Sequence, residues 1–178
     1  PVKEPSDHLN QTIISLTKQT LLDFDIFLVD YAQSRESSKA VHNHFLSLVD
    51  AVPQITIRYA KAEGTNEYDA FSTGVRKATA PNVAFLQPGD AVGANTTADA
   101  IQLFARDFTG LVLPNVPGAF DLSRFFPPNQ GVNAAEFVTG DFFYPNIFAR
   151  RIALLELDTF RLSDRPTYAI KELLIRLL

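Results

Sequence analysis

The stretch from Glu67 to Asp90 limits the folds open to this chain more than any other feature. It begins with polar residues and continues into a helical pattern over 68–79. A turn then leads to the apolar segment 82–86, which we predict to be a strand, and Asp90 follows shortly after it. Open α/β sheets bind their ligands at the carboxyl ends of their strands. This order therefore favours an α/β sheet with Asp90 near a ligand site.

The same alternation of helix and strand patterns extends over most of the chain. The strand pattern over 24–29 becomes fully apolar after Asp25, which indicates burial on both faces, and Asp30 follows at its carboxyl end. Because alternating strands and helices imply right-handed crossovers, we predict an α/β fold with a mostly parallel central sheet and helices on both faces. The predicted helices are 8–20, 36–49, 68–79, 97–108, 150–157 and 167–178, and the predicted strands are 24–29, 55–59, 82–86 and 110–114.

Composition excludes several classes of protein. The chain has 178 residues, of which 46% are hydrophobic, so we expect a single globular domain over 1–178. A net charge of -4 without a block of Lys or Arg argues against nucleic acid as a partner. No apolar run approaches the roughly 18 residues of a membrane span, and the absence of Cys excludes a thiol nucleophile. We expect a cytoplasmic protein, with the inner face of a membrane as the alternative location.

Several short motifs occur in an order that resembles one enzyme family. These are Pro1-Val-Lys-Glu, Leu16-Thr-Lys-Gln-Thr, Phe27-Leu-Val-Asp, Glu67-Tyr-Asp-Ala-Phe-Ser-Thr-Gly-Val, Phe85-Leu-Gln-Pro-Gly-Asp and the run 147–160. Their order and spacing resemble a family-2 glycosyltransferase, whose fold is the nucleotide-diphospho-sugar transferase (GT-A) fold. In that family a first strand precedes the motif that Pro1-Val-Lys-Glu resembles. The resemblance therefore implies a strand upstream of Pro1.

The resemblance implies transfer of a sugar from a nucleotide-diphosphate donor to a carbohydrate or lipid-linked acceptor, assisted by Mg²⁺ or Mn²⁺. Asp30, Asp69 and Ser72 would contact the nucleotide, and Asp90 would bind the metal at the Asp-x-Asp position. Carboxylate oxygens suit such a cation. Each acid also has a structural interpretation, since Asp30 could cap the following turn, Asp69 could complement the helix dipole, and Asp90 could belong to a Pro-Gly-Asp turn.

The position of the catalytic base departs from the family pattern. Counting back from Arg176, the residues at the family's acidic pair are Ala169 and Ile170, and neither side chain can accept a proton. Substitutes could be Asp164, Glu172, Asp141 or Glu136. The alternative is a catalytically inactive relative that binds a nucleotide or sugar, or serves as a scaffold. A nucleotidyltransferase is a third class with the same phosphate and metal chemistry.

Overall fold

Alternating helices and strands build the described part of this computed structural model, which comprises residues 1–105, 111–112, 147–160, 169, 172–173 and 176. The helices are α1 (Asp7–Thr17), α2 (Arg35–Ala51), α3 (Glu67–Lys77), α4 (Thr96–Phe104) and α6 (Arg151–Glu156). The strands are β1 (Asp25–Asp30), β2 (Thr56–Lys61), β3 (Asn82–Phe85), β4 (Leu111–Val112) and β5 (Ile147–Arg150). The predicted α/β class is confirmed.

The strands form two sheets within the described residues. β1 and β2 pair in parallel, from Asp25 opposite Thr56 to Asp30 opposite Lys61, and α2 is the crossover that parallel pairing requires. Val2 adds a parallel bridge to Asp30 on the other edge of β1. In the second sheet β5 lies between β3 and β4 and runs antiparallel to both.

Two expectations about the strands are therefore wrong. Parallel pairing does not extend to β4, and sequence reasoning missed β5 altogether. The reason is that β5 is only four residues long and leads directly into α6, so its sequence lacks a separate periodic signal.

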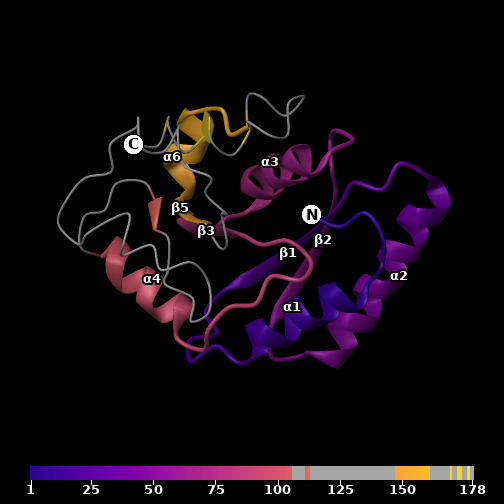
Figure 1. The fold of residues 1–178 in the computed structure, drawn as a ribbon, viewed down its shortest axis with the longest axis horizontal. Coiled ribbons are helices and arrows are strands. Elements are labelled where there is room, and N and C mark those ends of the chain that lie inside the picture. Colours follow the sequence, from indigo (N-terminus) through magenta and orange to yellow (C-terminus); the bar gives the residue numbers. More distant parts are fainter. Residues whose placement is uncertain (106–110, 113–146, 161–168, 170–171, 174–175, 177–178) are drawn as a thin grey trace.

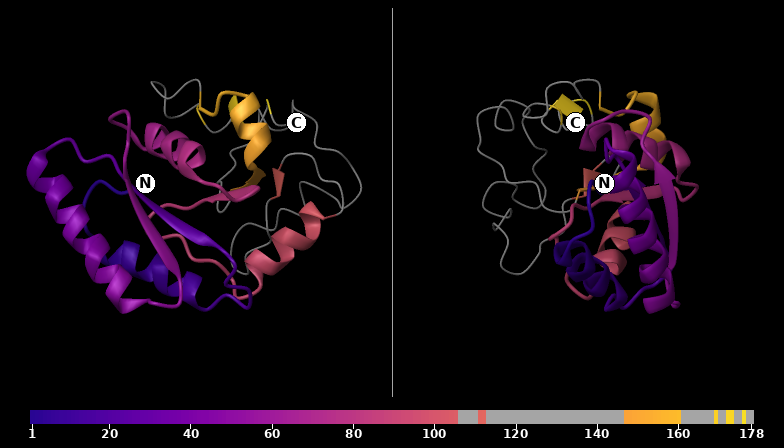
Figure 2. Two further views of the ribbon diagram at one scale, coloured as in Figure 1. Left: turned by 180° about the vertical axis from the view of Figure 1, so that it is seen from behind. Right: turned by 90° about the vertical axis from the view of Figure 1, so that its right-hand side faces the viewer.

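Helices cover both faces of the β1–β2 sheet, as predicted. Figure 1 and the reverse view in Figure 2 show α1 and α2 on one side of these strands and α3 on the other. One apolar cluster joins α1, α2, β1 and β2, including Leu9, Leu28, Val41 and Ile57. A second joins α3 to β3, β5 and α6, with Phe71, Phe85, Ala149 and Leu154 among its members.

Local sequence explains most helix boundaries. Ser6 and Asp7 are the two residues whose type and position favour a cap before this helix, and Ser6 is the one that accepts a hydrogen bond from the Leu9 N–H and caps α1. The helical pattern over 36–49 predicts that Val41, Phe45, Leu48 and Val49 face inward, but Val49 is 37% exposed because α2 packs through Val41 and Leu48. The helical pattern over 167–178 places Ile170, Leu173, Leu174 and Leu177 on one face, and Leu173 is buried whereas the other three lie outside the described residues. The stretch 114–138, whose prolines and lack of periodicity predict a loop, also lies outside the described residues.

No helix among the described residues is long and apolar enough to cross a membrane.

Candidate functional site

Polar residues from three separate segments meet at the carboxyl ends of β1 and β3. Gln87, which follows β3, connects Asp90 to Glu67 at the start of α3. The Gln87 backbone N–H donates to the Asp90 carboxylate at 2.6 Å, and its Nε2 donates to Glu67 Oε1 at 3.2 Å. Burial lowers the pKa of the Pro1 amine to about 6, while the charges of Glu67 and Asp90 act in the opposite direction. The two carboxylates therefore share one electrostatic neighbourhood with Pro1.

Tyr31, which follows β1, belongs to the same neighbourhood. Burial raises the pKa of the Tyr31 hydroxyl, and the charges of Glu67 and Glu4 raise it further. We call Tyr31, Glu67, Gln87 and Asp90 the rim site. Carboxylates at the carboxyl ends of strands can bind a cation, and an aromatic residue that follows such a strand can contact a base or sugar.

Asp90 is held by a tight turn that is docked on α1. The Asp90 N–H donates to the Gln87 carbonyl at 3.0 Å, and Gly89 has a φ of +105°, which glycine adopts without strain. The Gly89 N–H donates to Thr12 Oγ1 at 2.9 Å and to the His8 carbonyl at 3.1 Å. The predicted Pro-Gly-Asp turn is thus present, and it fixes the position of the carboxylate.

The charge of Asp90 is only partly compensated. Burial raises the pKa of Asp90 above its usual 3.8, and this effect exceeds the opposing ones of the Gln87 N–H and the Pro1 amine. A carboxylate whose charged form is disfavoured in this way gains from a bound cation. Within the described residues, however, no group of three His, Asp or Glu side chains could hold a metal by itself.

Asp30 occupies a different environment, in which both oxygens of its carboxylate accept hydrogen bonds from the protein. The residue is fully buried, and Oδ1 accepts from the Ala32 N–H at 2.7 Å. Oδ2 accepts from Tyr59 at 2.7 Å, from Lys61 at 3.1 Å and from the Ser38 hydroxyl. Burial raises the pKa of Asp30, but these hydrogen bonds together hold it below 3.8. The bond to Ala32 is the turn-capping role considered from the sequence.

Asp69 and Ser72 also make structural contacts. Asp69 accepts from the backbone N–H groups of Thr65 and Asn66, at 3.0 and 3.3 Å, and completes a capping box at the start of α3. Ser72 is buried and accepts a hydrogen bond from Thr159 at 2.9 Å. Within the described residues no hydrogen bond joins Asp30, Asp69, Ser72 or Asp90 to one another. Direct nucleotide contacts by Asp30, Asp69 and Ser72 stay predictions.

Glu67 is the rim residue that sequence reasoning missed. It is the first residue of α3 and opens the motif that contains Asp69, so its place in that motif was the available signal. The sequence interpretation considers Asp69 as a first-turn acid and gives no role to Glu67, whose side chain accepts the hydrogen bond from Gln87.

Where the structure describes the region of the expected catalytic base, it contains a buried apolar cluster and one ion pair. Ala169 is fully buried in a cluster with Leu173 and Phe160. Glu172 is paired with Arg176 at 2.6 Å, and Arg176 also donates to the carbonyls of Leu157 and Thr159. The other base candidates, Asp141, Asp164 and Glu136, lie outside the described residues, as does Ile170.

Solved structures of glycosyltransferases share the fold of this chain. A mannosyltransferase from Pyrobaculum calidifontis, solved with GDP-mannose and Mn²⁺, aligns over 88% of this chain and 44% of its own, with a TM-score of 0.65 and 17% identity. S. aureus TarS aligns over 96% of this chain and 32% of its own, with a TM-score of 0.65 and 15% identity. Residues 1–349 of TarS, solved with UDP, align over 96% of this chain and 50% of their own, with a TM-score of 0.64 and 15% identity.

These alignments show that the chain has a GT-A-like fold. The chain spans half or less of the length of these proteins. No protein-family model matches the sequence, and no curated protein sequence matches it.

Proposed function

We propose that this chain is a glycosyltransferase domain, related to family 2, that binds a nucleotide-diphosphate sugar and a divalent cation at the rim site. The observation that carries the proposal is the bridge that Gln87 forms between Glu67 and Asp90 at the carboxyl end of β3. In a GT-A-like α/β fold this is the edge of the sheet where ligands bind. Solved neighbours hold GDP-mannose with Mn²⁺ or UDP, which supports the same ligand class here.

The donor set suits Mg²⁺ or Mn²⁺ held jointly by protein and substrate. Asp90 would supply one carboxylate oxygen and Glu67 another, and the donor's phosphates and water would complete the shell. Asp90 and Glu67 would hold the cation, whose chemistry there would be to neutralise charge on a departing diphosphate. Gln87 keeps both carboxylates in place through its backbone and its side chain. The resemblance implies that Asp69 and Ser72 would contact the nucleoside.

Asp30 then acts as a positioning residue. Its bonds to Ala32, Ser38 and Lys61 hold the turn between β1 and α2, and Tyr31 lies in that turn. A rigid turn keeps the Tyr31 ring in place against a base or ribose. The resemblance further implies a carbohydrate or lipid-linked acceptor, met in the cytoplasm or at the inner face of a membrane.

One observation favours a second candidate function. Ala169, at the position where the family has an acid, is buried in an apolar cluster. That environment suits a non-catalytic relative that binds the nucleotide or sugar without transferring it. Asp164 and Asp141 are the weaker base candidates that an active enzyme would use.

Calorimetry with UDP and GDP, each with and without Mn²⁺, tests the proposal. We expect heat of binding that requires Mn²⁺ and an affinity at least about 10-fold weaker in Asp90→Asn and Glu67→Gln, which corresponds to about 1.4 kcal/mol. Glu63→Gln is the matched control, because this carboxylate is 64% exposed and pairs with Arg76 instead. Binding without slow hydrolysis of a donor sugar would favour the inactive relative. Unchanged binding in Asp90→Asn would refute the rim site.

A further inference from the structure

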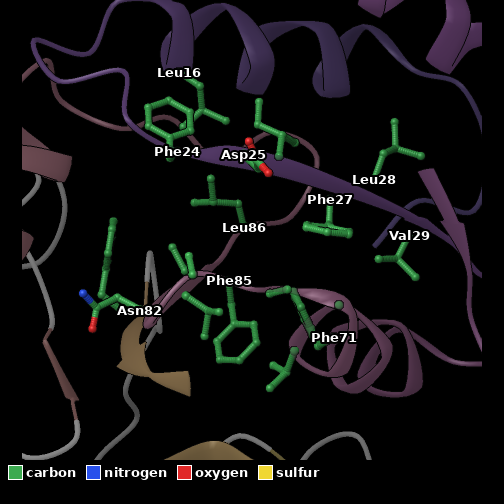
Figure 3. A pocket seen from close by; sticks show the side chains of 18 of the residues that line it. Leu16, Phe24, Asp25, Phe27, Leu28, Val29, Phe71, Asn82, Phe85 and Leu86 are labelled. Carbon is green, nitrogen blue, oxygen red and sulfur yellow. The ribbon is translucent and has the colours of Figure 1, made fainter. Parts of the chain in front are cut away.

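Thr12 differs from its neighbours on the buried face of α1 because it is polar. Of the four buried residues of this helix it alone carries a hydroxyl, and it is 4% exposed. Leu9, Ile13 and Leu16 join the apolar cluster with β1 and β2. All four residues line an apolar cavity of about 470 Å³, and Figure 3 shows Leu16 and Leu86 among the side chains around it. A buried hydroxyl costs free energy unless it is hydrogen-bonded, so the partners of Thr12 explain its presence on this face.

The Thr12 hydroxyl contacts the Asp90 turn at two points. Its Oγ1 accepts from the Gly89 N–H at 2.9 Å and donates to the Gln87 carbonyl at 3.3 Å. It also donates to the His8 carbonyl of α1 at 3.1 Å. A hydroxyl has one hydrogen and two lone pairs, so the two carbonyls share its hydrogen and Gly89 uses a lone pair. One buried oxygen thus joins α1 to the backbone on both sides of Pro88.

These two points of contact also determine where the Asp90 carboxylate lies. The Gln87 N–H donates to that carboxylate at 2.6 Å, and the Gln87 carbonyl accepts from the Asp90 N–H at 3.0 Å. Gly89 directly precedes Asp90 and holds a φ of +105°. A shift of Gln87 or Gly89 relative to α1 therefore moves the carboxylate away from its place in the rim site.

Two further side chains hold the later part of the same loop. Ser15, three residues after Thr12 on α1, accepts from the Val92 N–H at 3.3 Å. Gln19, just beyond the helix, bonds to the backbone of the last part of the loop and of α4. Thr12 is therefore the member of this series that holds the backbone next to Asp90, and Ser15 provides an internal comparison.

We propose that Thr12 is a positioning residue for the cation-binding carboxylate of Asp90. This inference rests on the proposed function, since it concerns the cation that Asp90 would hold. Groups that are hydrogen-bonded behind a metal ligand fix its orientation, and their loss typically lowers metal affinity about 10–100-fold. A valine at position 12 has nearly the same shape as threonine, but it can neither accept from Gly89 nor donate to Gln87. The His8 carbonyl then remains to accept from Gly89, at 3.1 Å.

The unaltered chain, Thr12→Val, Thr12→Ser and Ser15→Ala together test this inference. Thr12→Ser keeps the hydroxyl, and Ser15→Ala is the matched control because it removes a hydroxyl that bonds to the same loop from the same helix. Calorimetry gives the affinity for UDP and for GDP with and without Mn²⁺, and the ratio of the two affinities measures the gain from the cation. We expect this ratio to fall at least about 10-fold in Thr12→Val. It should be retained in Thr12→Ser and in Ser15→Ala.

Amide hydrogen exchange at Gly89, followed by NMR without any nucleotide, reports on the turn itself. We expect faster exchange at Gly89 in Thr12→Val and unchanged exchange in Ser15→Ala. Thermal melts of the same proteins separate this effect from a loss of stability, because a residue with a purely structural role lowers the Tm and leaves the cation ratio unchanged. If Thr12→Val does not fold, Thr12→Ala replaces it with the same expected results.

The outcomes that contradict the inference differ from those that contradict the proposed function. An unchanged cation ratio in Thr12→Val, with or without a lower Tm, overturns the positioning role alone. A lower ratio with unchanged exchange at Gly89 also overturns it, because the hydroxyl would then not act through the turn. If the unaltered chain shows no Mn²⁺-dependent binding of UDP or GDP, the proposed function fails. The positioning role then fails with it, and faster exchange at Gly89 would leave Thr12 as a structural anchor of the turn.

Discussion

Replacing Asp30 with Asn tests whether this buried carboxylate holds the β1 end of the sheet. The Asn side chain has nearly the same shape, but it replaces one carboxylate oxygen with an NH₂ group. The three side chains that donate to Oδ2, from Ser38, Tyr59 and Lys61, then lose their acceptor. The Ala32 N–H keeps the remaining oxygen. The change therefore removes charge-assisted bonds and leaves the packing almost unaltered.

The expected loss of stability follows from these contacts. A hydrogen bond to a charged group contributes about 1.5–3 kcal/mol. Lys61 is 48% exposed, so water replaces most of its interaction, and we count only Ser38 and Tyr59. At the lower value these two bonds give about 3 kcal/mol in the free energy of unfolding. For a chain of this size that lowers the Tm by about 6–12 °C.

Urea and thermal denaturation followed by circular dichroism measure this difference. The matched control is Asp25→Asn on the same strand, where the carboxylate is 35% exposed and pairs with Arg58 at the surface. An exposed pair of this kind contributes less than about 1 kcal/mol. A similar small loss in both variants would refute the role of Asp30 as a buried anchor.

The lowered pKa of Asp30 also leads to a prediction for how the free energy of unfolding depends on pH. Because the folded protein holds the pKa of Asp30 below 3.8, its contribution is present above that pH and is lost as the pH falls through the lower folded value. In Asp30→Asn this part of the acid dependence should be missing. If the variant loses as much stability at low pH as the unaltered protein does, other carboxylates cause that loss.

Three further predictions concern α3, the rim turn and Pro1. Asn66→Ala removes the cap of α3 and should cost about 1 kcal/mol in urea denaturation, and an unchanged midpoint would contradict the capping geometry. Gly89→Ala forces a side chain onto a φ of +105° and should cost about 1–2 kcal/mol in the free energy of unfolding, measured by thermal melts. An unchanged Tm would contradict this expectation, because it would mean that the turn relaxes without strain. In the 178-residue chain, burial lowers the pKa of the Pro1 amine from 8.0 to about 6. Because the unfolded chain then binds the extra proton, stability should fall by about 2 kcal/mol from pH 8 to pH 6. Acetylation of that amine should remove the dependence, and a dependence that persists after acetylation would contradict this assignment.

The candidate site shows most clearly which contacts could be predicted from the sequence and which could not. Asp90 was predicted at the end of a strand and lies there, because a turn with Pro and Gly is a local signal. The partner that connects it to Glu67 is Gln87, which lies 20 residues from Glu67 along the chain. The partners of Asp30 at Tyr59 and Lys61 come from the neighbouring strand, 29 and 31 residues away. No local pattern reports such contacts.

The amino-acid sequence by itself determined the helices α1 to α4 and α6, most of the described strands and the α/β class, because periodicity acts between residues a few positions apart. Only the tertiary structure decided that β5 runs antiparallel between β3 and β4, that Asp30 is enclosed by its neighbours, and that Glu67 shares the rim with Asp90. The physical reason is that strand order and side-chain neighbourhood depend on how separate segments pack. That packing is set by the burial of apolar surface over the whole chain.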